Sequence, residues 1–150
     1  MLTVPVRNDT PFPHAAELVR AVEAALRSRG VEEATVELAV VGDAAMHGFN
    51  NRWLGHDYPT DVLSFVLEED PLEGQLFVNP DYAAREAAAH NWPDHELPAA
   101  ARELMLYAAH GALHLCGLDD ATEQQRRAMR RAEAAALAAC GVPVPAGHAG

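Results

Sequence analysis

The most informative segment of this chain is His110-Gly111-Ala112-Leu113-His114-Leu115-Cys116-Gly117-Leu118-Asp119-Asp120. One helical turn separates the two histidines, so both imidazoles leave the same face of a helix and can bind one ion. Gly117 can adopt the left-handed conformation that ends a helix, and the turn that follows brings Asp119 or Asp120 towards the imidazoles. Two imidazoles and one carboxylate leave a coordination position open, as in catalytic zinc sites. The segment therefore predicts a site for one metal ion at the end of a long helix.

The same segment permits two other interpretations. A pair of histidines one turn apart on a helix is often simply a pair of surface or core side chains. The spacing His-x3-His-x2-Gly-x2-Asp also matches a metzincin-like peptidase, which needs a glutamate directly after the first histidine as its general base. Gly111 occupies that position, and this argues against peptidase chemistry.

Around this segment, hydrophobic periodicity and turn residues predict a single α+β domain spanning residues 1–150. Pro98 begins and Gly117 ends the long helix, while Thr122 and Gln125 have capping-box spacing for a last helix that runs to Cys140. The other predicted elements are strands at 2–7, 35–41, 61–67 and 75–79, the last two forming a hairpin, and helices at 13–30, 43–54 and 81–90. Together they predict a small mixed β-sheet covered by helices.

Two of these elements carry more detailed expectations. Asp43 precedes a helical pattern and is expected to cap that helix with its side chain. Residues 141–150 are rich in Gly and Pro, and this composition predicts a loose tail in which His148 has no role.

The composition narrows the class of protein. The 150 residues are 49% hydrophobic, and no apolar run reaches the roughly 18 residues that a membrane span needs. Residues 1–9 lack the basic segment and apolar stretch of a signal peptide, which favours a cytoplasmic location. Cys116 and Cys140 are too few for a disulfide framework, and both lie in helical patterns.

The charge balance bears on possible partners. The net charge is −11, and the eleven basic residues are all arginines. Phosphate binding normally draws on basic patches, so this balance argues mildly against a nucleic-acid partner. Four arginines nevertheless crowd into one predicted helix and could meet an RNA backbone, although a solvated helix face explains them equally well: Arg126, Arg127, Arg130 and Arg131.

A second notable segment is Asp57-Tyr58-Pro59-Thr60-Asp61-Val62-Leu63-Ser64-Phe65. It predicts a turn that leads into a buried strand. Thr60, Asp61 and Ser64 are polar groups beside that strand, and each needs a hydrogen-bond partner if it is buried. These three side chains are therefore candidates to line a binding pocket.

Both segments resemble the YbeY family of endoribonucleases. The first carries His-Gly-x-Leu-His-Leu-x-Gly-x-Asp and the second Pro-Thr-Asp-Val-Leu-Ser-Phe, and the likeness extends over residues 35–133, including Asn50 and Arg102-Glu103. The resemblance implies an α+β fold and single-strand endoribonuclease activity in 16S rRNA 3′-end maturation and ribosome quality control. It also implies one Zn2+ or other divalent transition metal per chain, with rRNA and ribosomal proteins as partners, and neither a membrane nor a small organic cofactor.

The resemblance assigns the ligands as well. His110, His114 and Asp120 stand at the three ligand positions of the family, although the third ligand is normally a histidine. Aspartate is a competent zinc ligand, so the site can survive this change. Glu103 lies two helical turns before His110 on the same face and can orient a ligand, or it can be an ordinary buried carboxylate.

The catalytic machinery departs from the family at one further position. Leu54 stands where the family usually has an arginine that can hold phosphate or stabilise transition-state charge. Arg52, nearby on the same predicted helix, is the candidate substitute. Three functions therefore remain open: a metal-dependent ribonuclease, a catalytically weak metal-binding ribosome-assembly factor favoured by Leu54 and the acidic charge, and a metzincin-like peptidase disfavoured by Gly111.

Overall fold

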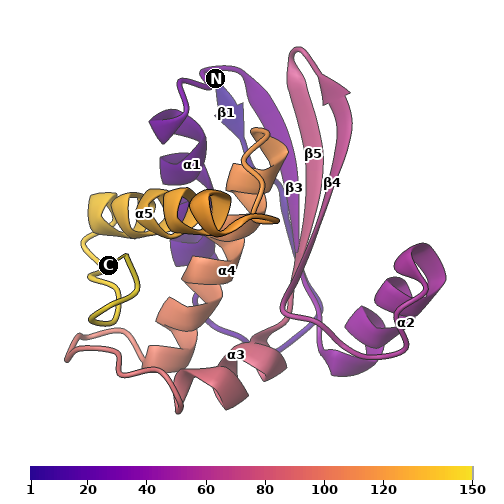
Figure 1. Cartoon of the computed structure of the whole chain (residues 1–150). Helices are drawn as coiled ribbons and strands as arrows, with labels where there is room; N and C mark the ends of the chain where they lie inside the picture. The colour runs from indigo at the N-terminus through magenta and orange to yellow at the C-terminus, as the bar shows by residue number, and fades with distance from the viewer. Residues whose placement is uncertain (150) are drawn as a thin grey trace.

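A computed structural model describes residues 1–149 of the chain. These residues form five strands and five helices, arranged as a mixed sheet with helices on both faces (Figure 1). This architecture confirms the predicted α+β class. The strands are β1 (Leu2–Thr3), β2 (Val6–Asn8), β3 (Ala34–Val40), β4 (Val62–Glu69) and β5 (Leu72–Val78), and the helices are α1 (Ala15–Ser28), α2 (Asp43–Leu54), α3 (Pro80–Ala87), α4 (Ala99–Leu115) and α5 (Glu123–Ala139).

The sheet has the order β1–β3–β5–β4, and β2 also pairs with β3. Strands β1, β2 and β5 run parallel to β3, whereas β4 runs antiparallel to β5. The single edge strand predicted at 2–7 is therefore two short strands, interrupted at Pro5, which has no amide hydrogen to donate to the sheet. The predicted β4–β5 hairpin is confirmed, and its strands extend further than expected, up to a turn at Asp70-Pro71.

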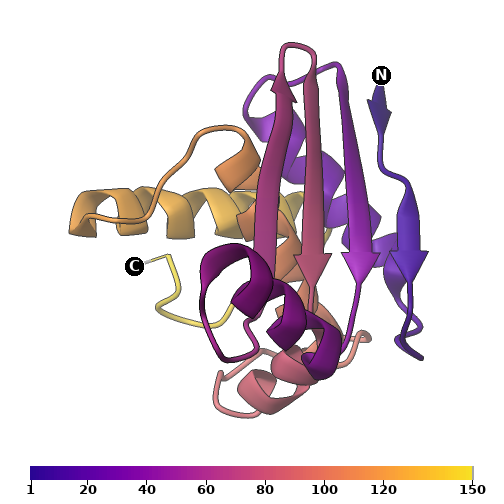
Figure 2. The ribbon, with the colours of Figure 1, turned by 90° about the vertical axis from the view of Figure 1, so that its right-hand side faces the viewer.

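Helix α4 lies at the centre of the molecule. It contacts β4 and β5 on one side and α1, α3 and α5 on the others, and most of its residues are buried. Figures 1 and 2 show α1, α4 and α5 on one face of the sheet and α2 on the opposite face. A helix packed on all sides needs an apolar surface all round, which explains why α4 is so rich in Ala, Leu and Met.

The expected helix caps are partly correct. Thr122 and Gln125 form the predicted capping box at the start of α5. The prediction for Asp43 is wrong, because Gly42 is the N-cap of α2 and makes no side-chain cap. The carboxylate of Asp43 instead accepts two hydrogen bonds from the guanidinium of Arg85, which ties α2 to α3. The hydrogen bonds from Arg85 lower the pKa of Asp43, and they outweigh burial, which raises it.

The residues after α5 differ from the predicted loose tail. Val142 is buried, and its amide donates a hydrogen bond to the carbonyl of Leu137. Further along, His148 contacts Glu133 of α5. The segment therefore packs back onto the helices as far as His148, and residue 150 lies outside the described residues. Among residues 1–149, no helix combines the length and apolarity that a membrane crossing requires.

Candidate metal centre

The last turn of α4 and the loop after it bring three potential ligands together. The Nε2 atoms of His110 and His114 lie 3.0 Å apart, and Oδ2 of Asp120 lies 3.5 Å from each of them. Gly117 has a φ of 94°, the left-handed conformation that ends α4 and reverses the chain. Asp119 is exposed, and its Oδ1 accepts a hydrogen bond from the amide of Asp120, whereas the atoms that lie within 4.8 Å of one another belong to His110, His114 and Asp120. The structure thus selects Asp120 from the two carboxylates that the local sequence left open.

The geometry of these atoms fits Zn2+ or a similar divalent ion. Zinc bonds of about 2.0–2.1 Å at tetrahedral angles would separate two ligand atoms by roughly 3.3–3.4 Å. The observed separations are 3.0 Å between the two nitrogens and 3.5 Å from each nitrogen to the carboxylate oxygen. All three side chains are half-buried, so the site can be reached from solvent. The three residues can therefore hold one metal ion and leave a position for water or substrate.

Glu133 of α5 supports this site from the protein interior. Its Oε2 accepts a hydrogen bond from Nδ1 of His110, which leaves Nε2 of the same ring for a metal. Burial lowers the pKa of His110, but the hydrogen bond and charge of Glu133, together with the charges of Asp120 and Asp61, raise it by more. Burial raises the pKa of Glu133, but hydrogen bonds from His110 and His148 lower it by more. The pKa is therefore below its usual value, and the carboxylate is ionised at neutral pH.

The sequence contained a signal for Glu133. The buried face of α5 consists of Met129, Glu133, Ala136 and Leu137, which recur at helical spacing. A single carboxylate within such an apolar stripe must find a polar partner in the interior. The partner is on another helix, and the pattern by itself does not identify it.

The structure bears on the two roles that the sequence left open for Glu103. Its Oε1 accepts hydrogen bonds of 2.8 Å from Nδ1 of His90 and from Nε1 of Trp92. Two helical turns place it about 10 Å along α4 from His110. Glu103 therefore ties the loop before α4 to the helix, which favours the second of its two roles, a buried carboxylate. The carboxylate that contacts His110 is Glu133.

A cavity of about 440 Å³ opens beside His110 and His114. Asp61 and Ser64 line it, and so does Leu54 at the end of α2. Thr60 does not line the cavity, but its hydroxyl donates a 3.1 Å hydrogen bond to Oδ1 of Asp61. Two of the three polar candidates from the second sequence segment, Asp61 and Ser64, therefore meet the histidines of the first at one cavity.

The arginines considered as substrate contacts are placed differently. Arg126 and Arg127 hydrogen-bond to Glu123, and Arg130 lies 4.0 Å from the same carboxylate. One acidic residue at the start of α5 thus offsets part of this positive cluster. Arg52 is exposed on α2, and it is not among the described residues that line the cavity.

Comparisons with known proteins agree with this architecture. Residues 7–141 match the family model described as endoribonuclease YbeY. The endoribonuclease YbeY of Rhodopirellula baltica is 41% identical over 132 residues, which cover 86% of this chain and 66%, just under two thirds, of that protein. The endoribonuclease YbeY of Pelotomaculum thermopropionicum is 40% identical over 126 residues, covering 77% of this chain and 79% of the relative.

A solved structure supports the fold independently. The solution structure of TM1509 from Thermotoga maritima superposes with a TM-score of 0.59 and covers 94% of this chain and 92% of that one. Its sequence is 19% identical, so this likeness supports the fold alone. Because the family model matches most of the chain and the relatives exceed 30% identity, the chain belongs to the endoribonuclease YbeY family.

Proposed function

We propose that this protein is a metal-dependent endoribonuclease that cleaves single-stranded RNA, acting in 16S rRNA 3′-end maturation and ribosome quality control. Membership of the YbeY family supports the endoribonuclease activity. The observation that carries the proposal is the convergence of His110, His114 and Asp120 beside an open cavity. We further propose rRNA and ribosomal proteins as partners and the cytoplasm as the location.

In this proposal His110, His114 and Asp120 hold one Zn2+ or another divalent transition-metal ion. Such an ion lowers the pKa of a bound water or polarises a phosphoryl oxygen. Glu133 keeps the ring of His110 in the orientation that leaves Nε2 free for the metal.

The cavity wall supplies candidate contacts to the RNA strand. The hydroxyl of Ser64 can donate to a phosphate oxygen, and the carboxylate of Asp61 can accept a hydrogen bond from a ribose 2′-hydroxyl, the group that distinguishes RNA from DNA. Thr60 supports Asp61 in this position. Arg126 and Arg130 are further candidates to bind the RNA backbone, because a phosphate could replace Glu123 as their anionic partner. Arg52 is a weaker candidate, since it does not line the cavity.

One observation favours a second candidate, a catalytically weak ribosome-assembly factor. Leu54 lines the cavity at the position where the family usually has an arginine, so the wall lacks that cation. The peptidase alternative loses support, because a Cβ added to Gly111 would lie 2.8 Å from Cδ2 of Leu76 and 2.9 Å from Cγ2 of Val62. Position 111 thus faces the sheet, and a glutamate there could not serve as a base in the cavity.

A cleavage assay with Zn2+-loaded protein separates these functions. Labelled single-stranded RNA, duplex RNA and a peptide substrate are incubated with wild type, His114→Ala and the matched variant Asp119→Ala. We expect internal cleavage of single-stranded RNA by wild type and Asp119→Ala, and only background cleavage by His114→Ala. Equal cleavage of RNA by wild type and His114→Ala would contradict the proposal. Hydrolysis of the peptide substrate would favour the peptidase alternative. Co-sedimentation of inactive His114→Ala with ribosomal subunits would favour the assembly factor if wild type also fails to cleave.

A further inference from the structure

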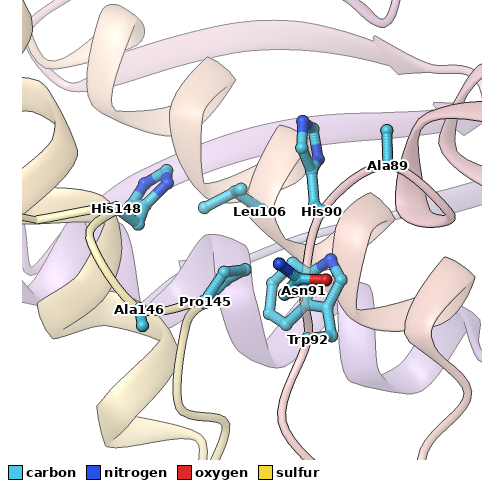
Figure 3. Close-up of a pocket in the computed structure, with 8 residues that line it drawn as sticks. All are labelled: Ala89, His90, Asn91, Trp92, Leu106, Pro145, Ala146 and His148. Carbon is cyan, nitrogen blue, oxygen red and sulfur yellow. The ribbon is translucent and has the colours of Figure 1, made fainter.

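The chain after α5 folds into a turn that carries a histidine to the interior. Figure 3 shows Pro145, Ala146 and His148 on one side of a pocket of about 430 Å³, with Leu106 of α4 and Trp92 on the others. The imidazole of His148 is only 19% exposed, although it lies two residues from the end of the chain. The amide of His148 also donates to the carbonyl of Pro145, which closes the turn.

The buried partner of His148 is the carboxylate that supports the metal centre. Glu133 is 6% exposed, and each of its two oxygens faces a different imidazole. Nδ1 of His110 donates to Oε2, and Nε2 of His148 donates to Oε1 at 2.8 Å. A buried carboxylate needs hydrogen-bond donors for both oxygens, and here the second donor comes from the tail.

We propose that His148 is a positioning residue for the metal centre: it holds one oxygen of Glu133, which keeps the other on Nδ1 of His110 and directs Nε2 of that ring at the metal. The inference rests on the proposed metal site. The physical reason is rotational freedom, because a carboxylate held at one oxygen can turn about its side-chain bonds, whereas one held at both cannot. Partners beyond the ligands themselves typically contribute about 10- to 100-fold to metal affinity.

The base of the tail is attached independently of His148. Nη2 of Arg20 donates to the carbonyl of Cys140, and the side chain of His95 lies 3.0 Å from the carbonyl of Gly141. The buried Val142 follows directly. Removing the imidazole of His148 should therefore release Glu133 without detaching the start of the tail.

The test is Co2+ and Zn2+ binding, with three tail variants and one background. His148→Ala removes the donor to Glu133, His148→Gln replaces it with an amide donor, and Pro145→Ala changes the same pocket without touching Glu133. The fourth protein, Glu133→Gln, retains the shape of the side chain but loses its charge. Metal affinity is measured by competition with a chromophoric chelator, and the visible Co2+ absorption reports the geometry around the ion.

We expect His148→Ala to weaken metal affinity by about tenfold and to alter the Co2+ spectrum, while His148→Gln restores most of both and Pro145→Ala resembles wild type. In the Glu133→Gln background, His148→Ala should have little additional effect, since it acts through that carboxylate. Unchanged affinity and spectrum in His148→Ala, with only a lower melting temperature, would overturn the inference and leave the metal site standing. Equal metal content in wild type and His114→Ala would overturn the metal site itself.

Discussion

At the scale of single residues, Asp120 gives the proposed metal centre a different charge from the family pattern. A carboxylate lies 3.5 Å from both imidazole nitrogens, at a position where the family normally has a third histidine. A bound Zn2+ with two neutral imidazoles and one carboxylate carries one positive charge fewer than with three imidazoles. The ion is then a weaker attractor for the phosphate of a substrate.

The assignment of Asp120 leads to a direct comparison with its neighbour. We expect Asp120→Ala to lower the affinity for Zn2+ by at least about tenfold, since it removes one of three ligands, and Asp119→Ala to have a smaller effect. Asp120→His should retain the metal. Chelator competition measures all three, and a larger loss for Asp119→Ala would show that the carboxylate is wrongly assigned.

Leu54 is the second residue with a specific consequence. Its side chain is 46% exposed and lines the cavity beside the two histidines, so an arginine there could reach a bound phosphate. A charge-assisted contact of about 1.5–3 kcal/mol made in the transition state corresponds to roughly ten- to a hundred-fold in rate. We therefore expect Leu54→Arg to raise cleavage of single-stranded RNA by a factor in this range at low salt.

The control for that experiment is the double variant Leu54→Arg/His114→Ala, which should be inactive. If Leu54→Arg binds metal normally and cleaves no faster than wild type, position 54 does not limit the activity. If the double variant cleaves as well as Leu54→Arg, the activity comes from a contaminant.

At the scale of secondary-structure elements, the contact of α4 with the sheet places the two histidines of the proposed metal site. Gly111 follows His110 directly, and the absence of a side chain lets α4 approach Val62 of β4 and Leu76 of β5 closely. Val62 is β-branched and stiff at its first side-chain torsion, and Leu76 is fully buried, so neither can easily make room. Glycine at this position therefore sets the distance between the helix that carries the histidines and β4, which carries Ser64 and directly follows Asp61.

This packing predicts opposite effects for two glycines within helices. Gly111→Ala should destabilise the protein by up to about 2 kcal/mol, because overpacking of roughly 1–3 kcal/mol exceeds the gain of about 1 kcal/mol in helix propensity. Gly48→Ala in α2, where an added Cβ meets nothing within 4 Å, should stabilise it by about 0.5–1 kcal/mol. Urea unfolding monitored by circular dichroism measures both, and equal stabilisation by the two changes would contradict the close contact.

At the scale of the whole molecule, the charge distribution limits how RNA can be captured. The net charge is −11, and the largest group of arginines in the sequence is partly offset by Glu123. Few cations are therefore available to displace counterions from an RNA strand. Efficient capture would then depend on the proposed metal ion or on positive surface supplied by the proposed ribosomal partner.

The salt dependence of RNA binding tests this view of the molecule. We expect the plot of log affinity against log salt to have a slope no steeper than about −2, which corresponds to roughly three neutralised phosphates on a single strand. Glu123→Gln should bind more tightly and with a steeper slope, because it releases Arg126 and Arg127. Fluorescence anisotropy with a non-cleavable single-stranded RNA analogue provides the measurement, and a steep slope for wild type would reveal a basic surface that the charge distribution does not account for.

Much of this molecule follows from local sequence patterns. The one-turn spacing of His110 and His114 and the turn at Gly117 predicted a metal site. An apolar run at 61–67 and the short link to the next strand predicted the β4–β5 hairpin. The spacing of Thr122 and Gln125 likewise predicted the capping box of α5. These features depend on interactions between residues a few positions apart, which helical and strand geometry places without knowledge of the rest of the chain.

Other features arose only when the helices packed together. Glu133 lies 23 residues from His110 in sequence, and the contact between them exists because α5 crosses α4 at that turn. Glu103 shares a helix face with His110, yet its carboxylate lies beside His90 and Trp92. Helical periodicity tells which face a side chain leaves, but the partner on that face depends on the relative placement of whole elements. For the same reason a Gly- and Pro-rich tail carried no local sign that His148 would reach the buried oxygen of Glu133.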